Sequence, residues 1–208
     1  MDYEKNNKEV VPFEHYLELF KDIDPNEASK RCAVDYDEDA KEFKIRLMQR
    51  QHTIEFPTAI VKDENGDVVD NYQIRIFLMR FLIEARYVAS TGELLNYRQI
   101  PWGDVYYKPF EGRCLMRLAF GFGFSIDKFN KSMEKMGAIK MNIGDSSYRF
   151  EFINNYFVVF ILWAPDDEFP PSANILFEDN FAQIYRAEDL AVVGDISINE
   201  LKAISKQL

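Results

Sequence analysis

Residues 147–163, SYRFEFINNYFVVFILW, decide the fold class of this chain of 208 residues. The first half alternates aromatic and charged residues, which is typical of a strand with one face in water. The second half, Tyr156–Trp163, is apolar on both faces but much shorter than the ~20 residues of a membrane helix. The pair Asn154–Asn155 between the halves favours a tight hairpin. We therefore expect two neighbouring antiparallel strands, the second of them central in its sheet.

Other parts of the sequence show the spacing of apolar residues that is typical of helices. The pattern is clear in residues 12–23, 72–87, 111–120 and 126–136. Asp24, Asn71 and Ser125 are expected N-caps, and Pro25 stands where a first helical turn tolerates proline. Further strands are expected around residues 43–47, 52–62, 138–143 and 174–178. The sequence predicts an α+β fold with an antiparallel-rich sheet covered by helices, in one compact domain over residues 1–208.

Two segments have weaker patterns. Tyr97–Phe110 holds two prolines and five aromatic residues without a steady period, so we interpret it as an ordered loop. Near the C-terminus, Ser197 and Glu200 have the spacing of a capping box. We therefore expect a break at Gly194–Asp195 and a final helix from about Ile198.

Composition limits the classes of partner and the compartment. The formal charge is −10, which argues against nucleic acid or an anionic membrane as a partner, because both attract cationic surfaces. The two cysteines, Cys32 and Cys114, are too few for a disulfide framework and favour a reducing compartment. The N-terminus, MDYEKNNKEVVPFEHY, lacks the apolar stretch of a secretion signal. We expect a soluble cytoplasmic protein.

The acidic turn in WAPDDEFPPSANILFED, residues 163–179, is the first candidate site. Asp166, Asp167 and Glu168 follow an apolar strand, and carboxylates grouped on a turn are the ligands that Mg²⁺ or Ca²⁺ requires. A buried pair of these acids is also able to act as general acid and base. The plainer alternative is a solvated turn, since the spacing of an EF-hand is absent.

The aromatic segment is the second candidate. Trp102, Tyr106 and Tyr107 have the character of a pocket wall for a flat or sugar-like ligand. If the acidic turn folds toward them, the polar end of that pocket is formed by four further residues, which are Asp167, Glu168, Ser172 and Asn174. The alternative is a loop that its aromatic side chains pin to the core.

Motifs for familiar cofactors and reactions are missing from the sequence. There is no His and Cys set for zinc, no G-x-S-x-G elbow, and too few cysteines for an iron–sulfur cluster. GFGF at Gly121–Phe124 follows a predicted helix and lacks the residues of a nucleotide-binding loop. The sequence therefore favours a protein that is not an enzyme.

Four stretches together resemble the bacterial domain-of-unknown-function family 3786. They are IDPNEASKRCAVDYD, TGELLNYRQIPWGDVYYKPFEGR, DDEFPPSANILFED and RAEDLAVVGD. The resemblance covers about residues 19–194, with a helix appended at either end. It implies a corrinoid or redox setting, in which some members have a cysteine-rich cluster-binding segment that this chain lacks.

Three hypotheses about function follow. The first is a non-enzymatic accessory or small-ligand-binding protein of a bacterial, corrinoid-linked or redox-linked system. The second is a cation-dependent enzyme that uses Asp166, Asp167 and Glu168. The third is a protein-interaction module with an acidic surface.

Overall fold

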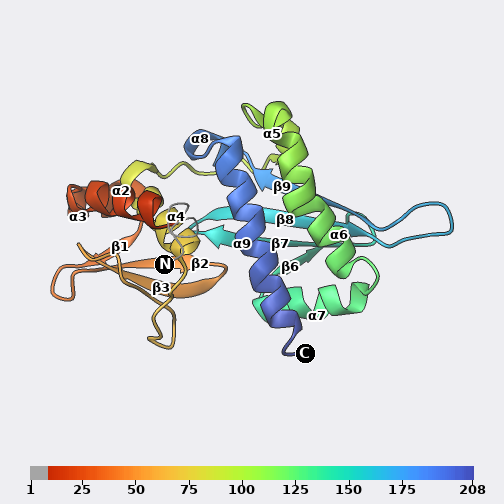
Figure 1. The fold of residues 1–208 in the computed structure, drawn as a ribbon, viewed down its shortest axis with the longest axis horizontal. Coiled ribbons are helices and arrows are strands. Elements are labelled where there is room, and N and C mark those ends of the chain that lie inside the picture. The colour runs from red at the N-terminus through yellow and green to blue at the C-terminus, as the bar shows by residue number, and fades with distance from the viewer. Residues whose placement is uncertain (1–8) are drawn as a thin grey trace, which may run out of the picture. The chain divides into compact units, whose positions relative to one another are not determined.

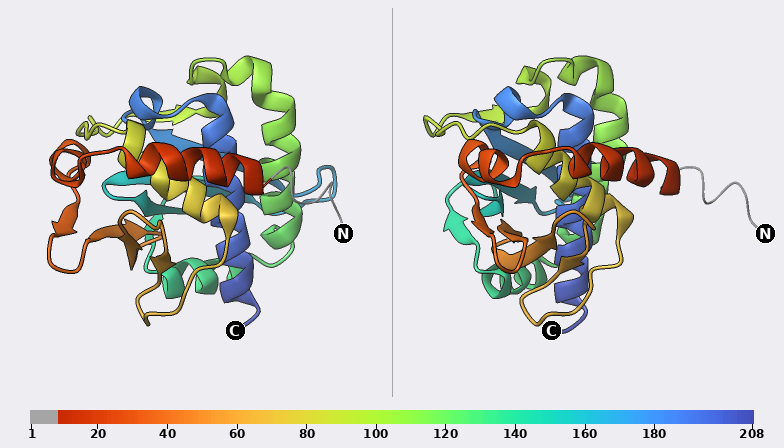
Figure 2. Two further views of the ribbon diagram at one scale, coloured as in Figure 1. Left: turned by 60° about the vertical axis from the view of Figure 1, so that its left-hand side comes forward. Right: turned by 90° about the vertical axis from the view of Figure 1, so that its left-hand side faces the viewer.

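The structure, a computed structural model, describes residues 9–208 and divides into two compact units (Figures 1 and 2). Unit 1 ends at Tyr87, and unit 2 runs from Val88 to Leu208. The α+β class is confirmed, with helices and antiparallel strands in both units. The single domain over residues 1–208 stays a prediction, and the N-terminal residues 1–8 lie outside the described residues.

Unit 1 combines helices with a small antiparallel sheet. Its elements are α2 (Val10–Lys21), α3 (Pro25–Cys32), β1 (Asp35–Asp37), β2 (Glu42–Leu47), β3 (Arg50–Glu55), β4 (Val61–Lys62) and α4 (Tyr72–Glu84). β2 lies between β1 and β3, and β4 pairs with β3. Helix α2 lies along α4 (Figure 2).

The N-caps predicted for two helices of unit 1 are confirmed. The Asp24 side chain accepts a hydrogen bond from the Glu27 amide, with Pro25 in the first turn of α3. Asn71 caps α4 in the same way through the Ile74 amide. The period of two in β2 buries alternate residues, which confirms a strand with one wet face.

Unit 2 contains antiparallel strands in the order β6-β7-β8-β9-β5. Its strands are β5 (Leu94–Asn96), β6 (Ile139–Met141), β7 (Ser146–Ile153), β8 (Tyr156–Trp163) and β9 (Ser172–Glu178). Its helices are η1 (Tyr97–Gln99), α5 (Gly103–Phe110), η2 (Glu111–Leu115), α6 (Met116–Phe122), α7 (Ile126–Met136), α8 (Phe181–Ile184) and α9 (Ala187–Ser205). In Figure 1, α6 and α9 lie over the face of β7, β8 and β9.

The hairpin predicted from residues 147–163 is confirmed, but the water-exposed face predicted for its first strand was wrong, because every residue of β7 except the half-buried Arg149 is buried. β7 and β8 pair in antiparallel register, with Phe150 opposite Val158. Asn155 has a φ of 66°, a left-handed conformation that asparagine tolerates better than most residues. β8 lies between β7 and β9, and its side chains from Val158 to Leu162 are buried. Its uniform apolarity follows from this central place.

The segment Tyr97–Phe110 is not a loop, so that prediction was wrong. A short 3-10 helix, η1, leads into α5, and the helical run continues through η2 and α6. Pro109 lies inside the run and has no N–H for the usual hydrogen bond. The chain accommodates it with the wider π-helical turn of η2 immediately after. The prolines and exposed apolar residues hid the helical period.

The predicted break at Gly194–Asp195 was also wrong, because α9 is continuous from Ala187 to Ser205. Ser197 is buried, and its hydroxyl donates to the Val193 carbonyl one turn earlier, so it does not cap a new helix. Gly194 lies against Cys114: a Cβ atom there would be 2.8 Å from the Cys114 Sγ. The glycine permits close helix packing and does not end the helix.

Candidate functional site

The turn before α5 places Trp102 in an unusual conformation. The Gly103 amide donates to the Ile100 carbonyl at 2.8 Å, which closes the turn. A Cβ atom on Gly103 would be 1.9 Å from the Tyr97 carbonyl oxygen, so only glycine fits. Trp102 itself has a φ of 68°, which is rare for a bulky residue. Its side chain is 72% exposed. The strained backbone and the exposed indole together make Trp102 the first candidate for a functional residue.

Trp102 lies at the edge of a pocket within unit 2, here called the aromatic pocket. Its volume is about 650 Å³, within the usual range for small-molecule sites. One wall comes from the start of α5 and the other from α8 and the start of α9. The lining residues are Pro101, Trp102, Val105, Tyr106, Ala182, Tyr185, Arg186, Ala187 and Glu188.

Buried contacts hold the two walls together. The Tyr97 hydroxyl donates to the Ala187 carbonyl at 2.6 Å, which joins η1 to α9. The Tyr97 ring stacks on Phe110 with 3.8 Å between ring centroids. Both rings are buried. The buried core beneath the pocket therefore fixes the positions of its two walls.

A polar pair lies at the edge of the aromatic pocket. The Tyr106 hydroxyl donates a hydrogen bond to the Glu188 carboxylate, and this bond, together with the negative charge, raises the pKa of Tyr106 above its usual 10.0. Both side chains line the pocket. Because the phenol O–H is already donated to Glu188, the pair offers a ligand hydrogen-bond acceptors beside apolar walls.

Tyr107, the third predicted aromatic residue, is not among the lining residues of this pocket. The Arg98 guanidinium lies over its ring at 3.6 Å from the centroid. Arg98 also forms an ion pair with Asp104 at 3.1 Å. Tyr107 therefore helps to pack the outer side of α5.

The structure does not bring the acidic turn to the aromatic pocket. Asp167 and Glu168 are exposed on the loop between β8 and β9, which Figure 1 shows extending away from the sheet. Where this loop joins β9, Pro171 contacts Gly123, just after the end of α6. Trp102 is at the other end of the helical run from α5 to α6. A run of about 20 helical residues spans about 30 Å.

The acidic turn also has an internal structural role. The Asp166 carboxylate accepts hydrogen bonds from the Glu168 and Phe169 amides, at 2.9 and 2.7 Å. Such a side chain closes a turn and needs no cation to do so. Among residues 9–208, no group of three or more His, Cys, Asp or Glu side chains is placed to hold a metal ion. Asp166, Asp167 and Glu168 are thus not gathered as the predicted cation site requires.

The two remaining predicted residues belong to β9. Ser172 is exposed at its first residue, opposite Trp163. The Asn174 side chain accepts a hydrogen bond from the Ile175 amide at 2.9 Å. Both lie toward the acidic-turn end of the strand.

The second wall of the aromatic pocket was missed in the sequence. Tyr185, Arg186 and Glu188 come some 80 positions after Trp102 and have no spacing that indicates a site. Tyr185 lies just before α9, and in the sequence Arg186 and Glu188 indicate no more than the beginning of that helix. A distant pair of segments is recognised only once the chain is folded.

The fold and the pocket define an α+β protein with a pocket of small-molecule size in unit 2. None of the helices between residues 9 and 208 has the length and apolar character needed to cross a membrane. The chain belongs to the family described as "Domain of unknown function (DUF3786)", whose model matches residues 24–200. This confirms the resemblance seen in the sequence. No curated protein and no solved structure matches the chain.

Proposed function

We propose that this chain is a small-ligand-binding accessory protein whose ligand occupies the aromatic pocket. The observation that carries the proposal is the Trp102 indole, 72% exposed and held by a left-handed backbone at the edge of a preformed hollow. An exposed indole adds no buried apolar area to the protein's own core. A ring that binds against it buries a large apolar surface.

The lining residues favour a flat ligand with a polar edge. Trp102 and Tyr106 present aromatic surface for a ring system, and Arg186 and Glu188 present charge at the same pocket. A pocket with apolar walls and a few polar groups is the usual architecture of small-molecule sites. A flat, mainly apolar ring that carries hydrogen-bonding substituents fits this combination.

The setting that we propose is the bacterial cytoplasm, with a role that is not enzymatic. The free thiols of Cys32 and Cys114 agree with a reducing compartment. The corrinoid or redox link rests on the family resemblance, and the acidic protein-interaction surface stays an alternative hypothesis.

Fluorescence of Trp102 tests the ligand site directly. The sequence has two tryptophans, so a Trp163→Phe variant leaves Trp102 as the single reporter. The probe is 1-anilinonaphthalene-8-sulfonate, a flat aromatic molecule with a charged edge. We expect quenching of the Trp102 emission that saturates as the probe binds. Replacing Trp102 by Leu in the natural background should weaken probe binding about tenfold or more, as for a central aromatic contact.

Phe169→Leu is the matched control. Its ring is 66% exposed, but it lies on the β8–β9 loop, away from the aromatic pocket. Probe affinity should be unchanged in this variant. Equal affinity in the Trp102 and Phe169 variants would mean that the probe binds exposed apolar residues in general, and the proposal would fail. Circular dichroism establishes that each variant is folded.

A further inference from the structure

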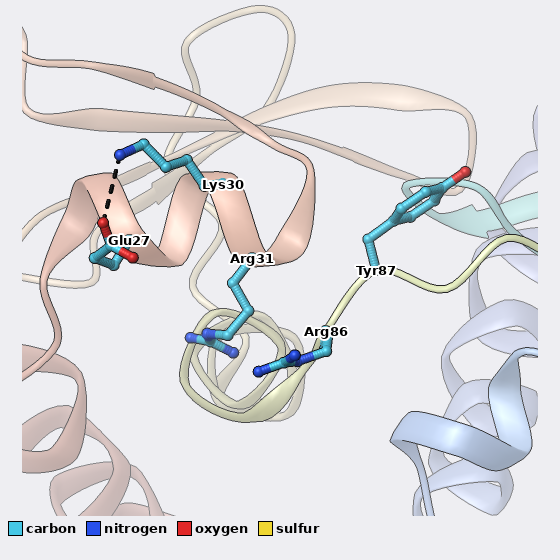
Figure 3. Close-up of a pocket in the computed structure, with 5 residues that line it drawn as sticks. All are labelled: Glu27, Lys30, Arg31, Arg86 and Tyr87. Atoms are coloured by element: carbon cyan, nitrogen blue, oxygen red, sulfur yellow. Dashed lines mark hydrogen bonds and ion pairs between the residues drawn. The ribbon is translucent and has the colours of Figure 1, made fainter.

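A different hollow in unit 1 gathers positive charge, and we call it the cationic pocket (Figure 3). Its volume is about 500 Å³. The lining residues are Glu27, Lys30, Arg31, Arg86 and Tyr87. Three cationic side chains thus meet one carboxylate, in a chain whose formal charge is −10. Such a group of cationic side chains attracts anions even where the protein as a whole repels them.

The backbone on both sides of Arg86 is anchored to α3. The Arg31 guanidinium donates to the Ala85 carbonyl and, at 2.6 Å, to the Leu82 carbonyl. In return, the Tyr87 amide donates to the Arg31 carbonyl at 2.8 Å. Because Ala85 and Tyr87 are both held, the intervening Arg86 has a fixed position beside Arg31. Figure 3 shows the two guanidinium groups directed toward one another at the end of α4.

Arg31 and Lys30 keep hydrogen-bond donors for a ligand. The carbonyl groups at the end of α4 carry partial negative charge, which Arg31 neutralises by capping them. A guanidinium has five N–H donors, and these two bonds use only some of them. Lys30 pairs with Glu27 at 3.4 Å, but both side chains are 74% exposed. Such a surface pair is weak, so the ammonium group can turn to a ligand.

We propose that the cationic pocket binds the phosphate group of a small molecule. Arg31 and Arg86 supply adjacent planar donors, the arrangement that suits phosphate oxygens. Guanidinium and ammonium donors from several residues of one hollow suit a phosphate group, which has more oxygen atoms to accept hydrogen bonds than a carboxylate. The Tyr87 ring, 41% exposed beside the guanidinium groups, offers a flat surface to the organic part of the molecule. This site is separate from the aromatic pocket, and its failure would leave the function proposed above untouched.

The experiment titrates the full chain with inorganic phosphate and follows backbone amides by NMR. Sulfate, acetate and chloride at equal ionic strength form the comparison arms. We expect saturable shifts at Arg31, Arg86 and Tyr87 with phosphate and sulfate, and much weaker effects with acetate. Chloride should produce no saturable change. Arg86→Gln should weaken phosphate binding about tenfold, the usual effect of losing a charged hydrogen bond.

The chain offers a matched control for charge. Lys21 pairs with Glu18 three residues earlier on an exposed helix, as Lys30 does with Glu27. Lys30→Gln should weaken phosphate binding severalfold, whereas Lys21→Gln should not change it. Equal weakening in the two lysine variants, unchanged binding in Arg86→Gln, or shifts centred elsewhere in the chain would each overturn the proposal. Arg31 is left unaltered because its loss would uncap α4.

Discussion

Gly194 is the residue at which α9 passes closest to Cys114. A Cβ atom at this position would be 2.8 Å from the Cys114 Sγ and 3.3 Å from its Cβ. Cys114 is completely buried and its neighbours leave it little room to move. The glycine therefore sets the separation of α9 from the helical run below it.

We predict that Gly194→Ala destabilises the protein by about 1–2 kcal/mol. Overpacking costs about 1–3 kcal/mol, and the better helix propensity of alanine returns up to about 1 kcal/mol. Urea unfolding measures the change. Gly112→Ala is the control, because a Cβ atom there meets nothing within 4 Å and should be neutral or stabilising. Adding Cys114→Ala to Gly194→Ala should restore part of the loss. A Gly194→Ala protein as stable as wild type would contradict the close packing.

The electrostatics of the aromatic pocket allow a second test at a single residue. A hydrogen bond to the Glu188 carboxylate, and then its charge, raise the pKa of Tyr106. Glu188→Gln removes the charge, so we expect the pKa of Tyr106 to fall toward 10. NMR titration of the ¹³C-labelled tyrosine ring measures it. Asp104→Asn on the exposed side of α5 should leave the value unchanged. No shift in Glu188→Gln would show that this pair is not formed in solution.

Among the elements, α9 is joined to the run from α5 to α6 by one carboxylate. Asp195 accepts from the Arg113 guanidinium at 2.8 Å and also from Arg117. Burial by itself would raise the pKa of Asp195, but the two arginines outweigh it, and the pKa lies below its usual value. The carboxylate therefore stabilises the folded state in its charged form.

We predict that Asp195→Asn destabilises the protein by about 1.5–3 kcal/mol near neutral pH, the range for hydrogen bonds to charged groups. A lowered pKa means that this contribution is complete above the unfolded pKa of about 3.9 and disappears as the pH falls through the folded value. Urea unfolding of both proteins between about pH 7 and pH 3 should show the difference shrinking on acidification. A difference that is constant with pH would contradict the ion pair. Asp145→Asn, a conservative change outside this cluster, serves as a comparison.

The elements that the sequence predicted are those whose signals are local. The hairpin of residues 147–163 follows from alternation and an Asn–Asn turn, and α3 and α4 follow from their caps. The failures depended on distant contacts. Pro109 suggested a loop because the π-helical turn that accommodates it has no sequence signature. Gly194 suggested a helix end because the Cys114 side chain that requires it lies 80 positions away.

Only one wall of the candidate site was predicted from the sequence, because the other wall comes from a distant segment of the chain. Trp102 and Tyr106 attracted attention as clustered aromatic residues, and both line the aromatic pocket. The acidic turn attracted equal attention, but the folded chain places it beside Pro171 and Gly123 instead. A stretch of unusual composition shows that a segment is special. It does not show which other segment meets it.

At the scale of the whole molecule, each unit contains one cysteine. Cys32 lies in unit 1 and Cys114 in unit 2, and both thiols are free and buried. Burial raises the pKa of Cys32 to about 11 and that of Cys114 to about 12. At about pH 8 neither thiol forms the reactive thiolate while the protein is folded.

The reactivity of the two thiols therefore reports how often the protein opens around each of them, with one thiol in each half of the chain. In Cys32→Ala and Cys114→Ala variants, the rate at which an aromatic disulfide reagent labels the remaining thiol measures how often its surroundings open. If the chain is one cooperative domain, as its sequence predicts, both rates should give the same free energy as global unfolding. Labelling of one thiol orders of magnitude ahead of the other would instead identify two halves that open independently, and would show which of them yields first.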